Sequence, residues 1–206
     1  MSKESELFRE LRLLGGQELL SEEQKAHVWQ KFGQTCAVLV GDMSGFTRRT
    51  KDYGILHFLT LINRMRGTVL PVLRESGADH IRVEADNIYA AFPHVDDALR
   101  GAVLAQQMIL EHNRSRPPAE FLELCIGIGY GKVLQAGHEG VFGDQMNLAS
   151  KLGEDTAKAF EILLTEQAFQ KLDATDHPRF EKCSTQVSEV AISYFKALIQ
   201  SESASA

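Results

Sequence analysis

Two aspartates in this sequence have the surroundings that chemistry at a phosphate group requires. Asp42 comes directly after a short apolar run at 36–40 and Gly41, a pattern typical of a strand buried on both faces. Asp86 lies between two strand-like segments within 80–92. A carboxylate at the end of a buried strand is well placed to hold Mg²⁺, which prefers oxygen ligands and keeps a phosphate-bearing substrate beside it. The alternative for Asp42 is an ordinary position in a strand-to-helix turn.

The elements around the two aspartates predict that they lie together. The apolar run reads as a strand, a helix follows at 55–73, and 80–92 reads as a hairpin joined near 84–87. In the order β-α-β-β, the second hairpin strand runs antiparallel to the first strand, so its start lies beside the end of that strand. Two neighbouring carboxylates repel each other unless a cation lies between them. A two-metal phosphoryl-transfer site explains the pair.

The small residues after Asp42 suit a tight turn into a helix. The free backbone N–H groups of such a turn and helix start can face phosphate oxygens. The sequence therefore nominates four consecutive residues as substrate contacts: Ser44, Gly45, Phe46 and Thr47.

Another candidate pair lies in the helix that opens within 141–152. Asn147 and Lys151 are four residues apart, so both project from one helical face. On the residues alone, a solvated surface pair is the usual fate of such side chains. The preceding strand carries glycines at 127, 129 and 131. Their spacing does not match a dinucleotide-binding fingerprint, and it predicts a close approach of another group to the strand backbone.

Four stretches, in order, resemble the class III nucleotidyl cyclases, the adenylate and guanylate cyclase catalytic domain. They are DMSGFT at 42–47, RVEAD at 82–86 with AF at 91–92, IGIGYG at 126–131, and VFGDQMNLASK at 141–151. The resemblance covers roughly residues 35 to 196. It implies an α+β fold with a ferredoxin-like β-α-β-β-α-β core, an antiparallel-rich sheet flanked by helices, and an N-terminal helical extension. It also implies that nucleotide or a partner subunit approaches the strand glycines.

The resemblance further implies an activity and a site. The activity is conversion of ATP into a 3′,5′-cyclic nucleotide, cyclic AMP, and pyrophosphate with two Mg²⁺ or Mn²⁺ ions per site. Asp42, Asp86 and the Met43 carbonyl correspond to the metal ligands. Asn147 corresponds to the asparagine that orients the ribose, and Lys151 stands where the family has an arginine that stabilises the pentavalent phosphate. These two residues would come from the other subunit of a homodimer.

Three positions depart from the family pattern. Arg82 replaces the lysine that reads the purine, and the flat, larger donor fork of arginine makes this a substantial change. Gly140 stands at the partner base-reading position, where Asp or Thr is usual; Glu84 could pair with Arg82, and Glu139 could substitute for the missing side chain. Lys151 offers a point charge in place of a bidentate arginine. The alternative function is a catalytically weak or inactive cyclase-homology module that acts in nucleotide binding, dimerisation or regulation.

Composition narrows the class of protein. The chain has 206 residues and a formal net charge of −6, which argues against nonspecific nucleic-acid binding. No apolar run approaches the ~18 residues of a membrane span, and the charged start does not resemble a signal peptide. Three scattered cysteines are typical of reduced core residues in a cytoplasmic protein. We predict a helical extension at 1–33, a class III cyclase domain at 34–200 and a disordered tail at 201–206.

Two further predictions concern helices. The extension is expected to form two helices, the second opened by a capping box of Ser21 and Gln24. It either packs on its own domain or serves as a dimerisation or signal-input element, since the only tryptophan, Trp29, lies in it. The helix at 55–73 is expected to present one apolar face, formed by Leu56, Leu59, Ile62, Met65 and Val69.

Overall fold

A computed structural model describes residues 5–16, 19–173, 177–187 and 190–199. The predicted disordered tail at 201–206 lies outside the described residues. The helices are α1 (Glu6–Gly15), α2 (Glu22–Phe32), α3 (Phe46–Tyr53), α4 (Ile55–Glu75), α5 (Val95–Arg114), α6 (Asp144–Ser150) and α7 (Glu166–Gln170). The short helices are η1 (Pro118–Glu120), η2 (Gly137–Glu139) and the π-helical η3 (Lys151–Thr156). The strands are β1 (Gly33–Met43), β2 (His80–Glu84), β3 (Asn87–Phe92), β4 (Leu124–Gln135), β5 (Val141–Phe142), β6 (Ile162–Thr165), β7 (Arg179–Val187) and β8 (Val190–Leu198).

The strands of the described residues form one sheet in the order β2-β3-β1-β4-β6-β8-β7, with β5 paired to β4. β1 lies between β3 and β4 and is antiparallel to both. β4 and β6 are parallel, and the remaining pairs are antiparallel. The predicted β-α-β-β-α-β core is confirmed as β1-α4-β2-β3-α5-β4, and the α+β class with it.

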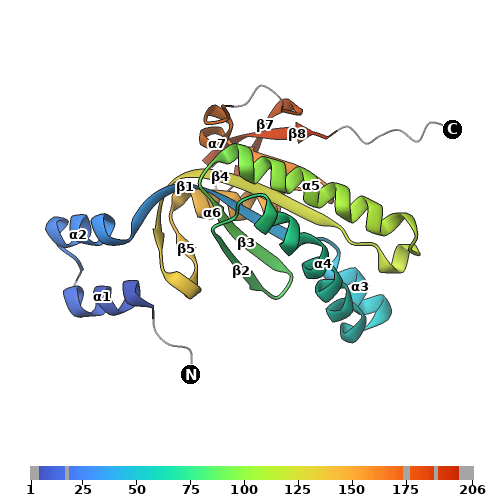
Figure 1. Cartoon of the computed structure of the whole chain (residues 1–206), viewed down its shortest axis with the longest axis horizontal. Coiled ribbons are helices and arrows are strands. Elements are labelled where there is room, and N and C mark those ends of the chain that lie inside the picture. Colours follow the sequence, from blue (N-terminus) through green and yellow to red (C-terminus); the bar gives the residue numbers. More distant parts are fainter. Residues whose placement is uncertain (1–4, 17–18, 174–176, 188–189, 200–206) are drawn as a thin grey trace.

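The two faces of β1 pack against different layers, because alternate side chains of a strand point to opposite sides. Leu39 and Met43 belong to the main core with α4 and α5, which lie across one face of the sheet in Figure 1. Val38 and Val40 pack on the opposite face with Ala149 of α6. The same alternation places Asp42 on the α6 face, away from the main core.

The buried stripe of α4 differs from the predicted one. It consists of Phe58, Leu61, Ile62, Met65, Val69 and Leu73. The prediction is wrong at its first two positions, since Leu56 and Leu59 are 77% and 50% exposed. At 100° per residue Leu56 lies about 160° around the helix from Phe58, so a stripe centred on Phe58 leaves Leu56 in solvent.

The N-terminal helices pack on one end of the sheet through a small core of their own. Leu7 of α1 and Val28 of α2 are buried together with Ala136, which follows β4. The capping box of Ser21 and Gln24 is confirmed at the start of α2. α2 ends at Phe32 and β1 begins at Gly33, while the division into an extension and a second domain stays a prediction. Figure 1 shows both helices on the side of the molecule where β5 lies.

Two predictions from composition concern the core and the membrane. Cys36 and Cys125 are buried free thiols on β1 and β4, as expected of reduced core residues. The expected core position is wrong for Cys183, which is a half-exposed free thiol on the strand β7. Among the residues that the structure describes, no helix combines the length and apolar character that crossing a membrane requires.

Candidate active site

Asp42 and Asp86 come to adjoining ends of two strands. β1 pairs with β3 up to Gly41 opposite Ile88, so Asp42 lies one residue past the last paired position. β2 and β3 are joined by a two-residue turn, and Asp86 is its second residue, directly before β3. The first turn residue, Ala85, has a φ of 50°, as tight hairpin turns require. The predicted hairpin and the predicted convergence of strand ends are both present.

The electrostatics of Asp42 reflect this convergence. The pKa of the Asp42 carboxyl is raised from 3.8 to about 7. Burial is the largest cause of this rise, and the negative charges of Asp86 and Glu154 contribute to it. A hydrogen bond from the Met43 backbone opposes the rise. The carboxyl therefore lies in a half-buried, negatively charged environment that disfavours its ionised form.

The donor set fits a divalent cation of the Mg²⁺ or Mn²⁺ type. Carboxylate oxygens suit these ions, and a positive charge would offset the repulsion that raises the Asp42 pKa. Within the described part of the chain, no three His, Cys, Asp or Glu side chains converge to enclose a metal. Mg²⁺ is commonly held by one or two carboxylates together with substrate phosphates, which is the arrangement that Asp42 and Asp86 offer. The Met43 side chain is buried in the main core, so only its main chain is available at the site.

The turn after Asp42 differs in one respect from the prediction. The Ser44 N–H donates to the Glu123 carbonyl at 2.9 Å, so it is not free for a phosphate. Gly45 has a φ of 89° and begins α3, which leaves the first N–H groups of that helix without partners inside the helix. The side chains of Phe46 and Thr47 lie outside the described part of the structure.

The residues assigned to base reading lie together. They form two pairs in the sequence, Arg82 with Glu84 and Glu139 with Gly140, which are more than fifty positions apart. The Arg82 Nη1 donates to the Glu139 carbonyl at 2.7 Å, and its Nη2 forms an ion pair with Glu84. The guanidinium also lies over the Tyr89 ring, 5.3 Å from the ring centroid. A Cβ at Gly140 would lie 2.9 Å from the Arg82 Nη1, so the absence of a side chain there makes room for Arg82.

Asn147 and Lys151 occupy one continuous helical segment. The Lys151 N–H donates to the Asn147 carbonyl across the junction of α6 and η3, which keeps the two residues one turn apart on one face, as predicted. Asn147 is exposed and Lys151 is half-buried. Neither is among the groups that shift the Asp42 pKa.

The helix that carries this pair lies directly against the glycines of β4. A Cβ at Gly127 would lie 2.1 Å from the Ala149 carbonyl oxygen, and one at Gly129 would lie 2.4 Å from that of Gln145. The close approach predicted for the glycines is confirmed. The predicted neighbour, a nucleotide or a partner subunit, is wrong: within the described residues, the chain's own helix α6 lies against these glycines. This contact buries Ala149 of α6.

Comparison with known proteins places this architecture. No protein-family model matches the chain, and no curated protein sequence matches it. A solved adenylate/guanylate cyclase/hydrolase from Silicibacter pomeroyi superposes with a TM-score of 0.70 at 24% identity, covering 81% of this chain and 97% of that one. The guanylate cyclase domain of RhGC from Catenaria anguillulae, in complex with GTP, gives 0.67 at 17% identity, covering 82% and 98%. A dimeric guanylyl cyclase domain of the RhoGC fusion protein from Blastocladiella emersonii gives 0.65 at 19%, covering 81% and 97%.

The chain has the class III cyclase fold. At these identities the likeness establishes the fold alone, and it includes nearly the whole of each solved cyclase domain.

Within this cyclase fold, sequence reasoning missed Glu154 and Tyr89. The Tyr89 hydroxyl donates to Glu154 Oε1 at 3.3 Å, and the Asn87 amide lies 3.5 Å from the same oxygen. Burial raises the pKa of Glu154, and the charge of Asp155 adds to the rise. Glu154 thus extends the acidic environment of Asp42 from the η3 side.

One signal in the sequence could have found Glu154. Gly153 precedes it, and a Cβ at Gly153 would lie 2.7 Å from the Val40 carbonyl oxygen. A glycine directly before two acidic residues, at the end of a predicted helix, indicates close packing that brings those acids to a neighbouring strand.

Proposed function

We propose that this chain is a nucleotidyl cyclase that forms a 3′,5′-cyclic nucleotide, cyclic AMP from ATP, and releases pyrophosphate. The observation that carries the proposal is the convergence of Asp42 and Asp86 at adjoining strand ends, with the Asp42 pKa raised to about 7. The cyclase fold supports it, since the solved proteins that share this fold include an adenylate/guanylate cyclase/hydrolase and a guanylate cyclase domain in complex with GTP.

The chain's own residues would divide the work. Asp42 and Asp86 would hold Mg²⁺ or Mn²⁺, which when bound lowers the pKa of the 3′-hydroxyl and neutralises the phosphates. Asp42 must be ionised to act as a ligand, so a proton leaves its carboxyl on metal binding. Lys151 would place its charge beside the transferring phosphorus, and Asn147 would orient the ribose.

We infer a composite site in a homodimer. In this arrangement Asn147 and Lys151 of one subunit would face Asp42 and Asp86 of the other, and a two-fold axis would give two equivalent sites. The exposure of Asn147 and the half-exposure of Lys151 leave both side chains accessible to a second copy. Such an enzyme would work on cytoplasmic nucleotide.

A product assay tests the proposal. The purified chain is incubated with Mn²⁺ or Mg²⁺ and each of the four nucleoside triphosphates, and cyclic product is measured by mass spectrometry. We expect cyclic AMP from the native chain and none above background from Asp42→Asn or Asp86→Asn. Asp52→Asn, an exposed aspartate of α3, is the matched control and should retain activity. No cyclic product from any triphosphate would contradict the proposal.

A second candidate, a cyclase-homology module that does not turn over substrate, is favoured by the state of Arg82. Both of its terminal nitrogens already have partners, the Glu139 carbonyl for Nη1 and Glu84 for Nη2, and the cavity beside it measures only about 10 Å³. The product assay separates the two candidates. A cyclase would form cyclic product, whereas the module would bind a nucleoside triphosphate in equilibrium dialysis and form no cyclic product.

A further inference from the structure

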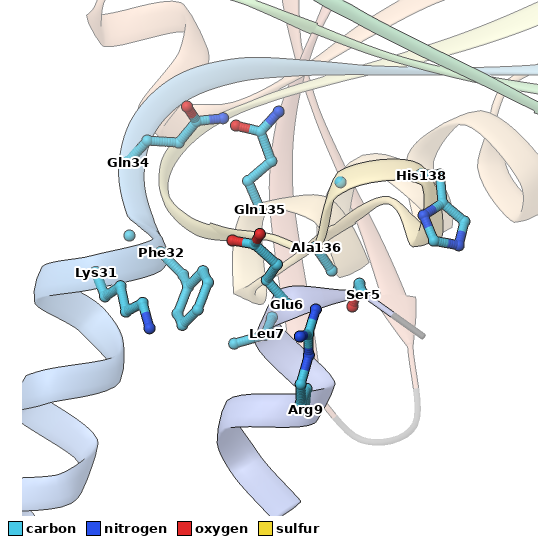
Figure 2. Close-up of a pocket in the computed structure, with 12 residues that line it drawn as sticks. Ser5, Glu6, Leu7, Arg9, Lys31, Phe32, Gln34, Gln135, Ala136 and His138 are labelled. Carbon is cyan, nitrogen blue, oxygen red and sulfur yellow. The ribbon is translucent and has the colours of Figure 1, made fainter. Parts of the chain in front are cut away.

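Helix α1 contacts the segment that connects β4 to β5. The Ser5 N–H, at the start of α1, donates to Glu139 Oε1 at 2.7 Å, and Ser5 is 5% exposed. Leu7 is buried against Ala136 at the other end of η2. Figure 2 shows Ser5 and Leu7 of α1 beside Ala136 and His138 of this connection.

A second contact joins α1 to β5. The rings of Phe8 and Phe142 meet edge to face with centroids 5.6 Å apart, a geometry that stabilises aromatic pairs beyond their buried area. Helix α1 therefore holds the connection at residues 136–142 from η2 to β5.

The connection is closed by hydrogen bonds between its own backbone groups. The Ala136 N–H donates to the Gly140 carbonyl at 2.8 Å, and the Glu139 N–H donates to the Ala136 carbonyl at 3.1 Å. Gly137 and Gly140 have φ of 55° and 113°, which few residues other than glycine adopt. The Glu139 carboxylate, which α1 contacts, and the Glu139 carbonyl therefore belong to one residue of a hydrogen-bonded segment.

That carbonyl fixes Arg82. It accepts from the Arg82 Nη1 at 2.7 Å, and Glu84 holds the other end of the guanidinium. The remaining cavity, lined by Arg82, Tyr89 and Gly140, measures about 10 Å³, room for about one water. Pockets for small ligands are on the order of 300–1,000 Å³, so the space beside Arg82 is too small for a base while the guanidinium lies there.

We propose that Glu139 is a positioning residue that couples the docking of α1 to the location of Arg82, so that docked α1 keeps Arg82 in the base-binding space. The identity of that space rests on the proposed function. Release of α1 would free the connection, let Arg82 leave this space and increase the affinity for nucleotide.

The docking of α1 is suited to release. A cavity of about 520 Å³ lies between α1, α2 and the connection (Figure 2), with Arg9, Lys31 and His138 on its wall. A polar cavity of this size is filled by water, so α1 has no packing against the described residues on that side. The contact of α1 with the connection thus consists of Leu7, the Phe8–Phe142 pair and the Ser5–Glu139 hydrogen bond. Glu10 ties α1 to α2 through His27 and Lys31.

The sharpest test removes one backbone N–H. Ser5 has a φ of −67°, which a proline ring adopts without strain, so Ser5→Pro deletes the donor to Glu139. Ser5→Ala is the matched control, because it loses the same hydroxyl, which caps the Phe8 N–H, and keeps the backbone donor. In the same way, Glu139→Gln keeps an acceptor oxygen for the Ser5 N–H and should leave the location of Arg82 as in the native chain, whereas Glu139→Ala should change it as Ser5→Pro does.

Two measurements on the full chain read the result. The Arg82 Nε–H signal in ¹H–¹⁵N spectra, assigned with Arg82→Lys, reports the location of the guanidinium without any nucleotide. We expect it to move in Ser5→Pro and to stay in Ser5→Ala. The dissociation constant of α,β-methylene-ATP with Mn²⁺, measured by equilibrium dialysis, should fall about tenfold in Ser5→Pro, or ~1.4 kcal/mol.

A second pair guards against a local effect of proline. Leu7→Glu places a charge at a position that is 2% exposed, and Leu13→Glu places it on the same helix at one that is 76% exposed. Only Leu7→Glu should move the Arg82 signal, and circular dichroism checks that both variants fold.

An Arg82 signal unmoved in both Ser5→Pro and Leu7→Glu overturns the coupling. Analogue affinity that is equal in Ser5→Pro and Ser5→Ala, or absent in both, overturns it as well. A moved signal and tighter analogue binding, together with no cyclic product, would leave the coupling standing and remove only the cyclase reaction.

Discussion

At the residue scale, the pKa of Asp42 links the acidic site to stability. Burial raises this pKa from 3.8 to about 7, and the charges of Asp86 and Glu154 contribute. The folded chain therefore binds a proton that the unfolded chain releases between about pH 4 and pH 7. The resulting stabilisation is fully present below the unfolded pKa and is lost as pH rises through the folded pKa.

Asp42→Asn should remove this dependence, because the amide cannot ionise. We expect the variant to raise the thermal midpoint relative to the native chain more at pH 8 than at pH 5, measured without metal. Mn²⁺ should stabilise the native chain at pH 8 and leave Asp42→Asn unchanged, with Asp52→Asn as the control. An equal effect of the substitution at both pH values would contradict the raised pKa.

Base selectivity also belongs to this scale. Both terminal nitrogens of Arg82 have partners in Glu84 and the Glu139 carbonyl, and Gly140 contributes no side chain, so the expected pair of base-reading groups is not formed. We expect ATP to be preferred over GTP by less than about tenfold in kcat/KM, or ~1.4 kcal/mol. Steady-state kinetics with both nucleotides measures the ratio. A larger preference would show that other residues read the base, and Glu84→Gln and Glu139→Gln would be the variants to compare.

At the element scale, the contact between α6 and β4 positions Asn147 and Lys151. The contact depends on glycines, since a Cβ at Gly127 would lie 2.1 Å from the Ala149 carbonyl. Backbone atoms cannot move aside as a flexible side chain does, so any side chain at Gly127 displaces the helix and the two residues it carries.

Gly127→Ala should therefore destabilise the chain by about 1–3 kcal/mol or more, the range for overpacking a core. Gly67→Ala is the matched control, because Gly67 lies within α4 with no atom within 4 Å of an added Cβ. It should stabilise the chain by about 0.5–1 kcal/mol, since Ala is the better helix residue. Urea unfolding of both variants measures the change in the free energy of unfolding. If Gly127→Ala left this free energy unchanged, the packing argument would be contradicted.

At the scale of the whole molecule, the open question is whether the site is shared between two subunits. Asn147 and Lys151 are not among the groups that dominate the Asp42 pKa within one chain. In a two-fold dimer, a protomer with Asp42→Ala and one with Asn147→Ala would form a heterodimer in which one site carries neither lesion and the other carries both.

Mixing the two inactive variants should therefore restore activity. With random exchange, half of the dimers are mixed and each has one intact site of two, so recovery should approach about a quarter of the native activity. Subunit exchange is followed separately, by mass spectrometry of differently tagged protomers. Proven exchange without recovery would place all the groups in one chain.

The sequence by itself determined the order of the core elements and which residues we propose for the site. The apolar runs fix β1 and β4, the Ser21–Gln24 box fixes the start of α2, and a β-α-β-β order leaves Asp42 and Asp86 at adjoining strand ends. These features follow from local propensity and from pairing rules, which act over short stretches.

Only the tertiary structure decided which groups surround those residues. The Ser5–Glu139 bond joins positions 134 residues apart, and the bond from Arg82 to Glu139 spans 57. Glu154 reaches the neighbourhood of Asp42 because Gly153 packs on the Val40 carbonyl, and Leu56 is exposed because Phe58 sets the buried stripe of α4. Such contacts depend on how whole faces of helices and strands pack together. The periodicity of a sequence shows which face is apolar, but it does not show which other element packs on that face.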